Sequence, residues 1–240
     1  MFKYSSKTLE KVWNFISNFW EELPSTSPNK KIEKFHKLEE RFIVKFAKKY
    51  DKNIKILDLG CGTGRCLKVL RDNGFKKLFG IDISSKMLSK AKSKLSNSAI
   101  LLKHDFRTKL PFETNYFDII LITGNTLTSG GLIESDIALK QAYRILKKNG
   151  FLIVGSYNAK FMTEDFVKRY YGNFPKELQF KRFDKKAKTV YFRVTFSHWV
   201  TKKELRKLIE NSGFKVVSIQ EKGIGLIALA KKSYINKIRS

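Results

Sequence analysis

One ten-residue stretch, ILDLGCGTGR at residues 56–65, constrains the fold more than any other part of the sequence. An apolar run leads into Gly60, Gly62 and Gly64, a pattern typical of a buried strand that turns tightly into a helix. Because glycine has no Cβ, the backbone of such a turn can approach a ligand closely. The N-terminus of the following helix adds unpaired backbone N–H groups. The stretch therefore predicts a ligand-binding loop at the edge of a parallel sheet.

Apolar and amphipathic segments alternate after this loop. The apolar ones predict strands, and they are residues 54–59, 77–83, 99–105, 116–123 and 151–157. Predicted helices follow the glycine loop to about residue 73 and cover 84–95 and 134–148, the last closed by Asn149 and Gly150. Either Ser84 or Ser85 is the expected N-cap of the second helix. Strands that are apolar almost throughout, joined by helices, predict a parallel sheet covered on both faces.

The C-terminal segment departs from this alternation. A helix is expected from Thr201, its N-cap, with Glu204 at the capping-box position. The apolar runs 215–220 and 226–232 then follow too closely for a parallel crossover, so they must pair as a hairpin. The sheet is thus predicted to have about seven strands, mostly parallel, with an antiparallel last strand.

Two further regions lie outside the repeating pattern. Residues 1–50 have apolar side chains at helical spacing and are predicted to form a helical cover, distinct from a main domain at 51–240. Residues 157–200 are read as an insertion on the acceptor side of that domain. Within it, the alternating stretches 178–184 and 189–196 predict an inserted β-hairpin.

The spacing of the glycines argues against a dinucleotide. The fingerprint G-x-G-x-x-G would need its third glycine at Arg65. Asp58, two residues before Gly60, would also repel a pyrophosphate, whereas it favours a ligand with a cationic end. A nicotinamide-dependent oxidoreductase is therefore disfavoured.

These residues resemble the first motif of class I S-adenosylmethionine-dependent methyltransferases. Three other stretches resemble later motifs of that family in the expected order: GIDIS around Asp82, 22 residues after Gly60; HDFRTKLPFETNYFDIILI from His104; and AYRILKKNGFLIVGS from Ala142. The resemblance covers roughly residues 52–156 and 201–231. It implies a Rossmann-like α/β fold and an enzyme that transfers the activated methyl group of S-adenosyl-L-methionine.

The resemblance also implies roles for individual residues in cofactor binding. Asp58 would help place the cofactor's amino end, Asp82 would accept hydrogen bonds from the ribose, and Asp105 would accept one from the adenine amino group. Ile83 would pack on the adenine face, and Phe106 would supply a backbone contact. The loop residues Gly60, Cys61, Gly62 and Gly64 complete this predicted set. The only cysteines, Cys61 and Cys66, are expected to be packing thiols.

The acceptor side is less constrained, because the activated methyl group needs a general base only for a protonated acceptor. Three residues are predicted to be catalytic: His198 as general base, Asn125 as the residue that orients an amine or carboxylate, and Tyr157 in the acceptor cover. Further candidates for acceptor contact are Asn158, Tyr191, Arg193 and Trp199. Among the N-terminal aromatics, Trp13, Phe15 and Trp20 could close over the cofactor or simply pack in the core. His36 is read as a packing or surface residue.

Composition leaves the acceptor open. The formal net charge is +27, from 49 Lys and Arg against 22 Asp and Glu, which favours a polyanion such as RNA. However, the lysines are spread along the whole chain, which equally fits a compositional bias and a small-molecule acceptor. RNA is slightly favoured here, with an amine or carboxylate-bearing metabolite as the alternative and a non-catalytic scaffold as a third class. Two cysteines and three histidines predict no disulfide scaffold and no metal site, and they fit a cytoplasmic protein. No membrane span is expected, because no apolar run approaches the roughly 20 residues of a membrane helix.

Overall fold

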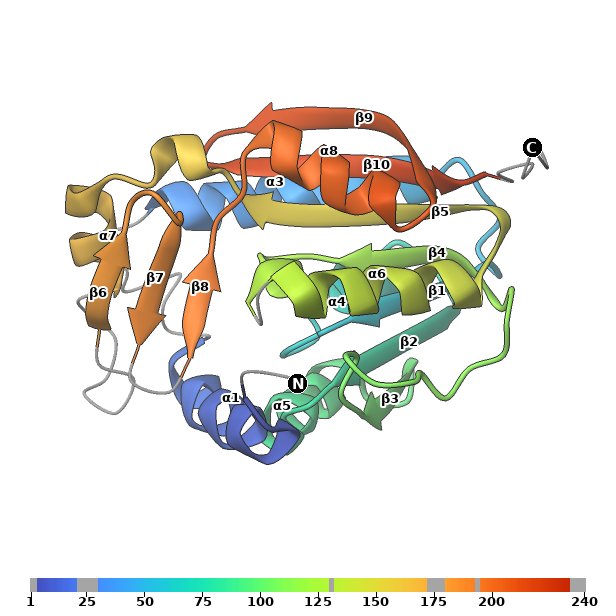
Figure 1. Ribbon diagram of the computed structural model, residues 1–240. Coiled ribbons are helices and arrows are strands. Elements are labelled where there is room, and N and C mark those ends of the chain that lie inside the picture. The colour runs from blue at the N-terminus through green and yellow to red at the C-terminus, as the bar shows by residue number, and fades with distance from the viewer. Residues whose placement is uncertain (1–3, 21–29, 130–131, 172–179, 193–194, 234–240) are drawn as a thin grey trace.

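A computed structural model describes residues 4–20, 30–129, 132–171, 180–192 and 195–233 of the chain. The strands of its larger sheet are β1 (Lys55–Leu59), β2 (Lys77–Asp82), β3 (Ala99–Lys103), β4 (Phe117–Ile122), β5 (Leu146–Tyr157), β9 (Phe214–Lys222) and β10 (Gly225–Lys232). They lie in the order β3-β2-β1-β4-β5-β10-β9 (Figure 1). This order reverses at β1 and β4, and a doubly wound sheet binds its ligand at such a point.

The strand directions confirm the predicted sheet. All contacts among β1 to β5 are parallel, whereas β10 runs antiparallel to both β5 and β9. The antiparallel last strand is therefore inserted between β5 and β9 and does not form the edge. Its pairing with β5 continues to Gly225 opposite Tyr157, which brings β10 to the functional end of the sheet.

Helices cover both faces of the sheet (Figure 1). Their bounds are α1 (Ser6–Trp20), α3 (Lys30–Ala47), α4 (Arg65–Asp72), α5 (Ser85–Leu95), α6 (Leu132–Ile145), α7 (Glu164–Tyr171) and α8 (Lys202–Asn211), with the short 3₁₀ turns η1 (Thr126–Thr128) and η2 (Ala159–Phe161). On one face, α6 and α8 pack against one buried cluster of side chains; α3, α4 and α5 pack against a second cluster on the other face. Within the described ranges, no helix has the length and apolarity needed to cross a membrane.

The helix predicted over 134–148 ends earlier than expected. It stops at Ile145, and the chain enters β5 at Leu146, which is fully buried opposite Phe117. Asn149, with φ of 62°, therefore lies in an irregular part of the strand and not at a helix end. The register shift beside it lets the strand resume regular pairing at Phe151. Burial of Leu146 thus takes precedence over the helix-stop signal.

Two predicted helix starts are confirmed. Ser84 caps α5 by accepting a hydrogen bond from the Met87 amide at 3.0 Å, and Thr201 and Glu204 form the full capping box of α8. The Ser84 hydroxyl also donates to Asn14 Oδ1 of α1 at 2.7 Å. The N-terminal helix α1 is therefore fastened to the start of α5.

The insertion is larger than the predicted hairpin. Strands β6 (Phe180–Asp184) and β7 (Thr189–Phe192) pair antiparallel as expected, and a third strand, β8 (Phe196–His198), joins β7 on its other side. Together they form a small separate sheet beside α7 and the functional end of the main sheet (Figure 1). Residues 178, 179, 193 and 194 of the predicted hairpin lie outside the described residues.

The two N-terminal helices pack differently. Helix α3 belongs to the main core, where a Cβ on Gly225 of β10 would lie only 2.1 Å from the Phe35 ring. Helix α1 instead forms a small cluster with Met87 of α5 through Val12 and Ile16. The predicted division into a cover at 1–50 and a domain at 51–240 stays a prediction, although α3 shares its core with the sheet.

Candidate active site

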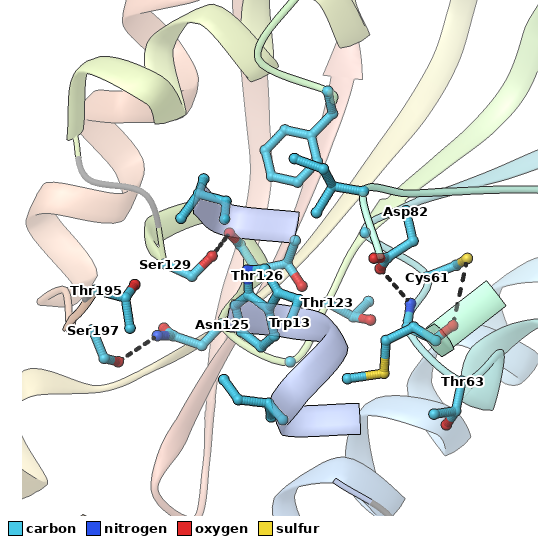
Figure 2. A pocket seen from close by; sticks show the side chains of 18 of the residues that line it. Trp13, Cys61, Thr63, Asp82, Thr123, Asn125, Thr126, Ser129, Thr195 and Ser197 are labelled. Carbon is cyan, nitrogen blue, oxygen red and sulfur yellow. Dashed lines mark hydrogen bonds between the residues drawn. The ribbon is translucent and has the colours of Figure 1, made fainter. Parts of the chain in front are cut away.

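One cavity opens at the carboxyl ends of β1, β2, β4 and β5, next to the three-stranded sheet. The wall on the glycine-loop side contains Asp58, Gly60, Cys61, Gly62, Asp82, Ile83, Asp105 and Phe106. The other lining residues are Asn125, Tyr157, Tyr170, Tyr171, Phe192, Phe196 and Ser197, with His36 of α3, whose carbonyl accepts from Arg65, and with Leu9, Trp13 and Ile16 of α1. Figure 2 shows the Asn125–Ser197 contact at one side of the cavity and Asp82 beside the glycine loop at the other. These residues therefore enclose one space.

The three loop glycines have different physical roles. Gly60 adopts φ of +72°, and a Cβ there would lie 2.3 Å from Thr126 Cγ2. A Cβ on Gly62 would instead meet no atom within 4 Å, so this glycine faces open space in the cavity. Gly64 packs against Leu95 and Ala91 of α5 and is not part of the cavity wall. Gly62 is thus the loop residue best placed for close approach of a ligand to the backbone.

Asp82 is held at the end of β2 by backbone donors. The Gly62 amide donates to its Oδ2 and the Ser84 amide to its Oδ1, both at 2.8 Å. Burial raises the pKa of Asp82 to about 6, although these N–H groups favour the ionised form. The carboxylate is therefore fixed in orientation beside Ile83, as a residue that binds ribose hydroxyls requires.

Asp58 has an unused hydrogen-bonding capacity. Its side chain is 1% exposed, and its Oδ1 is buried without a hydrogen-bond partner. Burial raises the pKa of Asp58 to about 7, Arg65 opposes that shift, and the nearby Glu39 and Asp82 add to it. A buried acceptor without a donor is costly. The cationic amino end of S-adenosylmethionine would satisfy this oxygen, so the residues present fit the cofactor.

An ion pair between the buried Glu39 and the partly exposed Arg65, near Asp58, was not predicted. Arg65 donates through Nη2 to Glu39 Oε2 at 2.5 Å and through Nη1 to Glu40 Oε1 at 2.9 Å. The other oxygen of Glu39, a fully buried side chain, accepts from the Gly124 amide at 3.1 Å. Arg65, which stands where a dinucleotide-binding loop would have its third glycine, thus connects α4 to α3. The signal in the sequence was a glutamate on the apolar face of a predicted helix.

Asp105 is already paired on the adenine side of the cavity. Arg107 donates to it through Nε and Nη2, at 2.9 Å and 2.6 Å to the two oxygens, and Ser6 of α1 donates at 2.6 Å. Burial raises its pKa, but these hydrogen bonds outweigh burial, so the pKa of Asp105 is lowered. An adenine amino group would share a carboxylate that Arg107 holds in place. Phe106 lines the cavity next to it, and its backbone contact to the cofactor stays a prediction.

Asn125 fastens three elements together. Its Oδ1 accepts from Ser156 Oγ, the Tyr157 amide and Thr128 Oγ1 at 2.8, 3.0 and 3.1 Å, and its Nδ2 donates to Ser197 Oγ and the His198 carbonyl, both at 3.3 Å. Its φ of 67° is one that asparagine tolerates better than most residues. Because its amide is fully engaged, Asn125 positions β5 and β8 and has no free group to orient an acceptor.

Tyr157 and His36 meet in the cavity. The Tyr157 hydroxyl lies 3.4 Å from His36 Nε2, and the two rings stack with centroids 6.3 Å apart. Burial, and secondly Arg65, hold the pKa of His36 well below its usual value, while burial raises the pKa of Tyr157 well above 10. His36 is therefore neutral at physiological pH and Tyr157 keeps its proton. His36 was read from the sequence as a packing or surface residue, whereas the structure places it in the wall.

His198 is not brought to this cavity. Its Nδ1 lies 2.9 Å from Thr189 Oγ1 within the small sheet, and its Nε2 is buried without a partner. The adjacent residue, Ser197, faces the cavity, because successive side chains of a strand point to opposite sides. The side chain of His198, the predicted general base, therefore points away from the cavity that Ser197 lines.

The other predicted acceptor residues are also distributed away from the cavity. Trp199 is fully buried and donates from Nε1 to the Tyr171 hydroxyl at 3.0 Å, so it supports the wall from behind. Asn158 and Tyr191 are not in the wall, and Arg193 lies outside the described residues. Of the N-terminal aromatics, Trp13 lines the cavity and Phe15 packs in the α1 cluster, whereas the Trp20 side chain lies outside the described residues.

Both cysteines are buried free thiols. Burial raises the pKa of Cys61 and of Cys66, so neither is a thiolate near neutral pH. Cys61 lines the cavity, and a Cβ on Gly80 would lie 2.8 Å from its sulfur. Packing thiols are what the sequence predicts, and the protonated state gives no reason to assign them a nucleophilic role.

Comparisons with known proteins agree with this geometry. The family model described as "Methyltransferase domain" matches residues 57–154. Demethylmenaquinone methyltransferase of Lactobacillus johnsonii is 30% identical over 204 residues, covering 76% of this chain and 79% of its own length. An uncharacterized protein of Methanocaldococcus jannaschii is 28% identical over 216 residues, covering 84% and 77%.

A solved structure shares the fold. Magnesium protoporphyrin IX methyltransferase of Synechocystis, determined with bound S-adenosylhomocysteine, superposes with a TM-score of 0.70 at 16% identity and covers 95% of this chain and all of its own. At this identity the match shows that the two chains share a fold. The chain therefore belongs to the class I S-adenosylmethionine-dependent methyltransferases.

Proposed function

We propose that this enzyme methylates a small aromatic acceptor held in the cavity between the cofactor loop and the three-stranded sheet. The observation that carries the proposal is the composition of the acceptor wall. It is formed by aromatic side chains from four elements or their flanks, namely Tyr157, Tyr170, Tyr171, Phe192 and Phe196. Flat apolar side chains suit a planar acceptor, and they exclude water from the reacting atoms.

The enclosure of the wall supports the same proposal. Tyr171 donates to Ser197 Oγ at 3.1 Å and accepts from Trp199, so hydrogen bonds behind it fix its ring. The opposite side is covered by α1, which contributes Trp13. A small molecule can be surrounded in such a space, whereas a nucleotide in a chain would need a continuous exit for its backbone. The names of relatives are consistent with small acceptors, since they include demethylmenaquinone and magnesium protoporphyrin IX.

The residues divide the work as follows. Asp58, Gly62, Asp82 and Asp105 would hold S-adenosylmethionine by its amino end, its backbone-facing middle, its ribose and its adenine. When bound, the cofactor supplies a methyl group on a positively charged sulfur, which is already an activated electrophile. The protein then needs to hold the acceptor in line and keep the space dry, which the aromatic wall can do.

RNA is the second candidate, and one surface feature favours it. A groove beside α7 and the small sheet is lined by the basic residues Lys160, Lys168, Arg182, Lys185, Lys188 and Lys202 and by only two acidic ones, Glu164 and Glu221. Such a groove could hold phosphates and would make binding strongly dependent on salt. It is lined by none of the residues of the cofactor cavity, so it does not by itself bring a base to the methyl group.

The experiment that separates the candidates uses the full chain with methyl-tritiated S-adenosylmethionine. Cell extract is divided into a low-mass fraction and total RNA, and each is incubated with the enzyme. We expect label in the low-mass fraction, and its absence from the Asp82→Ala control, which loses the ribose acceptor. Label in RNA alone would overturn the small-molecule proposal and support the second candidate.

A further inference from the structure

We propose that His36 is the general base of this enzyme, taking a proton from a hydroxyl group of an aromatic acceptor that lies next to Tyr157. This inference rests on the proposed function, because it names a hydroxyl-bearing aromatic, such as a phenol or hydroquinone, as the acceptor class. It transfers the role of base from His198, in the small sheet, to a histidine on α3 that the cavity actually exposes.

The first argument is position. His36 Nε2 would lie 3.9 Å from a Cβ on Gly124, just after β4, and it lies 3.4 Å from the Tyr157 hydroxyl at the end of β5. These two strand ends border the crevice in which this fold binds its ligands. The imidazole thus lines the cavity next to the loop that follows β4, with Arg65 at the start of α4 beside it.

The second argument is that the imidazole is held in place. Arg65 Nη1 donates to the His36 carbonyl at 3.1 Å, and one turn further along α3 Glu39 accepts from both Arg65 and the Gly124 amide. Phe35 packs against the Tyr157 ring with centroids 6.0 Å apart. The helix that carries the base is therefore connected to the loops on both sides of the cavity.

The third argument is the protonation state. The charged or titratable groups around the imidazole are Arg65 on α4, Tyr157 on β5 and Glu39 and Glu40 on α3, with Asp58 of β1 close to Arg65. Burial and the Arg65 charge favour the neutral imidazole, which is the form that can accept a proton. The 3.4 Å separation from Tyr157 is longer than an ordinary hydrogen bond, and Tyr157 has a second partner in Tyr170. Nε2 is therefore available to an acceptor hydroxyl.

The step balances without any further reactant. The O–H bond of the acceptor breaks and its proton moves to His36 Nε2. An electron pair on that oxygen forms the bond to the methyl carbon. The carbon–sulfur bond breaks and its electrons remain on sulfur as a neutral thioether. The imidazolium then loses its proton to water, and the Arg65 charge beside it favours this loss.

One test needs no acceptor. The chain contains three histidines, His36, His104 and His198, so ¹⁵N-histidine NMR of the full protein can follow each ring, with the His104→Gln and His198→Gln variants assigning the signals. We expect His36 to stay neutral as the pH falls through 6.5 and to shift when S-adenosylhomocysteine is added. An imidazole that titrates near 6.5 and ignores the ligand would overturn the assignment.

The second test compares His36→Gln with Lys37→Gln, an exposed residue on the same helix. Initial rates are measured with a panel of phenols and hydroquinones and with methyl-tritiated cofactor, and cofactor affinity is measured by calorimetry. For His36→Gln we expect kcat/KM for the acceptor to fall about 100-fold or more, cofactor affinity to change less than about threefold, and the acid limb of the pH profile to disappear. Tyr157→Phe should lower the rate less.

The outcomes distinguish this inference from the proposed function. If no low-mass acceptor is methylated by the wild-type chain, the proposed function fails, whatever the NMR titration gives. If methyl transfer to a phenol or hydroquinone proceeds equally in His36→Gln, the inference alone fails. It also fails if His36→Gln weakens cofactor binding tenfold with kcat unchanged, because His36 would then be a cofactor-binding residue.

Discussion

The Arg65 guanidinium and the Glu39 carboxylate form an ion pair, with Nη2 2.5 Å from Oε2, between the helix that begins at the glycine loop and helix α3. Glu39 is fully buried, and its second oxygen accepts from the Gly124 amide, so one carboxylate holds two loops that border the cavity. Removing Glu39 would leave the partly exposed Arg65 with Glu40 as its remaining partner and the Gly124 amide without its acceptor. The pair therefore links the stability of the fold to the shape of the site.

The first prediction concerns Glu39. Glu39→Ala should lower the free energy of unfolding by about 2 kcal/mol, and Glu39→Gln by about half as much, because glutamine can still accept from Gly124. The measurement is urea unfolding of each variant. Glu33→Ala on the same helix removes an exposed pair with Lys37 and should stay within about 0.5 kcal/mol of wild type. Equal losses for Glu39→Ala and Glu33→Ala would show that the interactions of Glu39 stabilise the fold no more than an exposed ion pair does.

The second prediction concerns Asp58 and pH. Its pKa of about 7 lies above the unfolded value of 3.8, so between these values the folded chain binds the extra proton, and its contribution to stability decreases as the pH rises. A cationic ligand prefers the ionised carboxylate, so binding of S-adenosylmethionine should release a proton. Affinity should then fall up to about tenfold for each pH unit below 7.

Calorimetry in buffers with different ionisation enthalpies measures this proton release directly. Asp58→Asn should bind the cofactor more weakly at pH 8 and lose most of the dependence on pH. Asp72→Asn, which alters an exposed carboxylate paired with Lys68, is the matched control and should behave as wild type. A cofactor affinity that is flat from pH 5 to 8 in the wild-type chain would contradict the prediction.

The third prediction tests the contact between Gly60 and Thr126. A Cβ at position 60 would lie 2.3 Å from Thr126 Cγ2, so Gly60→Ala should lower the free energy of unfolding by about 2 kcal/mol through overpacking and the positive φ. Thr126→Ser removes that methyl group, and the double variant should recover part of the loss. Thermal unfolding of the two single variants and the double variant gives the coupling. Strict additivity would mean that the φ constraint alone accounts for the effect.

The fourth prediction concerns Asn125. Asn125→Ala leaves the Ser156 hydroxyl and the Tyr157 amide without their acceptor, and it should cost about 2 kcal/mol or more of stability. Transfer activity should fall with it, because β5 and β8 lose their connection. Asn125→Asp keeps an acceptor oxygen but loses the donors to Ser197 and His198, so its stability should lie between those of wild type and Asn125→Ala. Asn211→Ala, at an exposed position, serves as the control.

Much of the fold could be predicted because local signals agree with tertiary structure. Asp58 lies one residue before the end of β1, Asp82 ends β2 and Asp105 follows β3, and the order of the strands brings all three to one cavity. The helix end at Ile145 could not be predicted, because it depends on burial of Leu146 against Phe117, a contact between distant segments.

The acceptor side was harder for the same physical reason. Successive side chains of a strand point to opposite faces, so a shift of one residue decides which of them reaches a cavity. Ser197 faces the cavity for this reason, whereas His198, the next residue, does not. His36 and Glu39 were hidden in a helix whose apolar face explained its pattern without them. Polar side chains on such a face were the one available signal, and a pairing partner for them could not be identified without the positions of Arg65 and Gly124.

The two glycines under α3 have a consequence for how the imidazole is held. Phe35 occupies the space that a Cβ at Gly225 would need, and Glu39 Oε1 would lie 1.5 Å from a Cβ at Gly155. Two side chains one helical turn apart therefore pack directly on glycines of two adjacent strands. A helix that packs closely at both glycines can neither slide along its axis nor rotate about it without a steric clash between these side chains and the strands. The height of His36 above the sheet is therefore set by the backbone of β5 and β10.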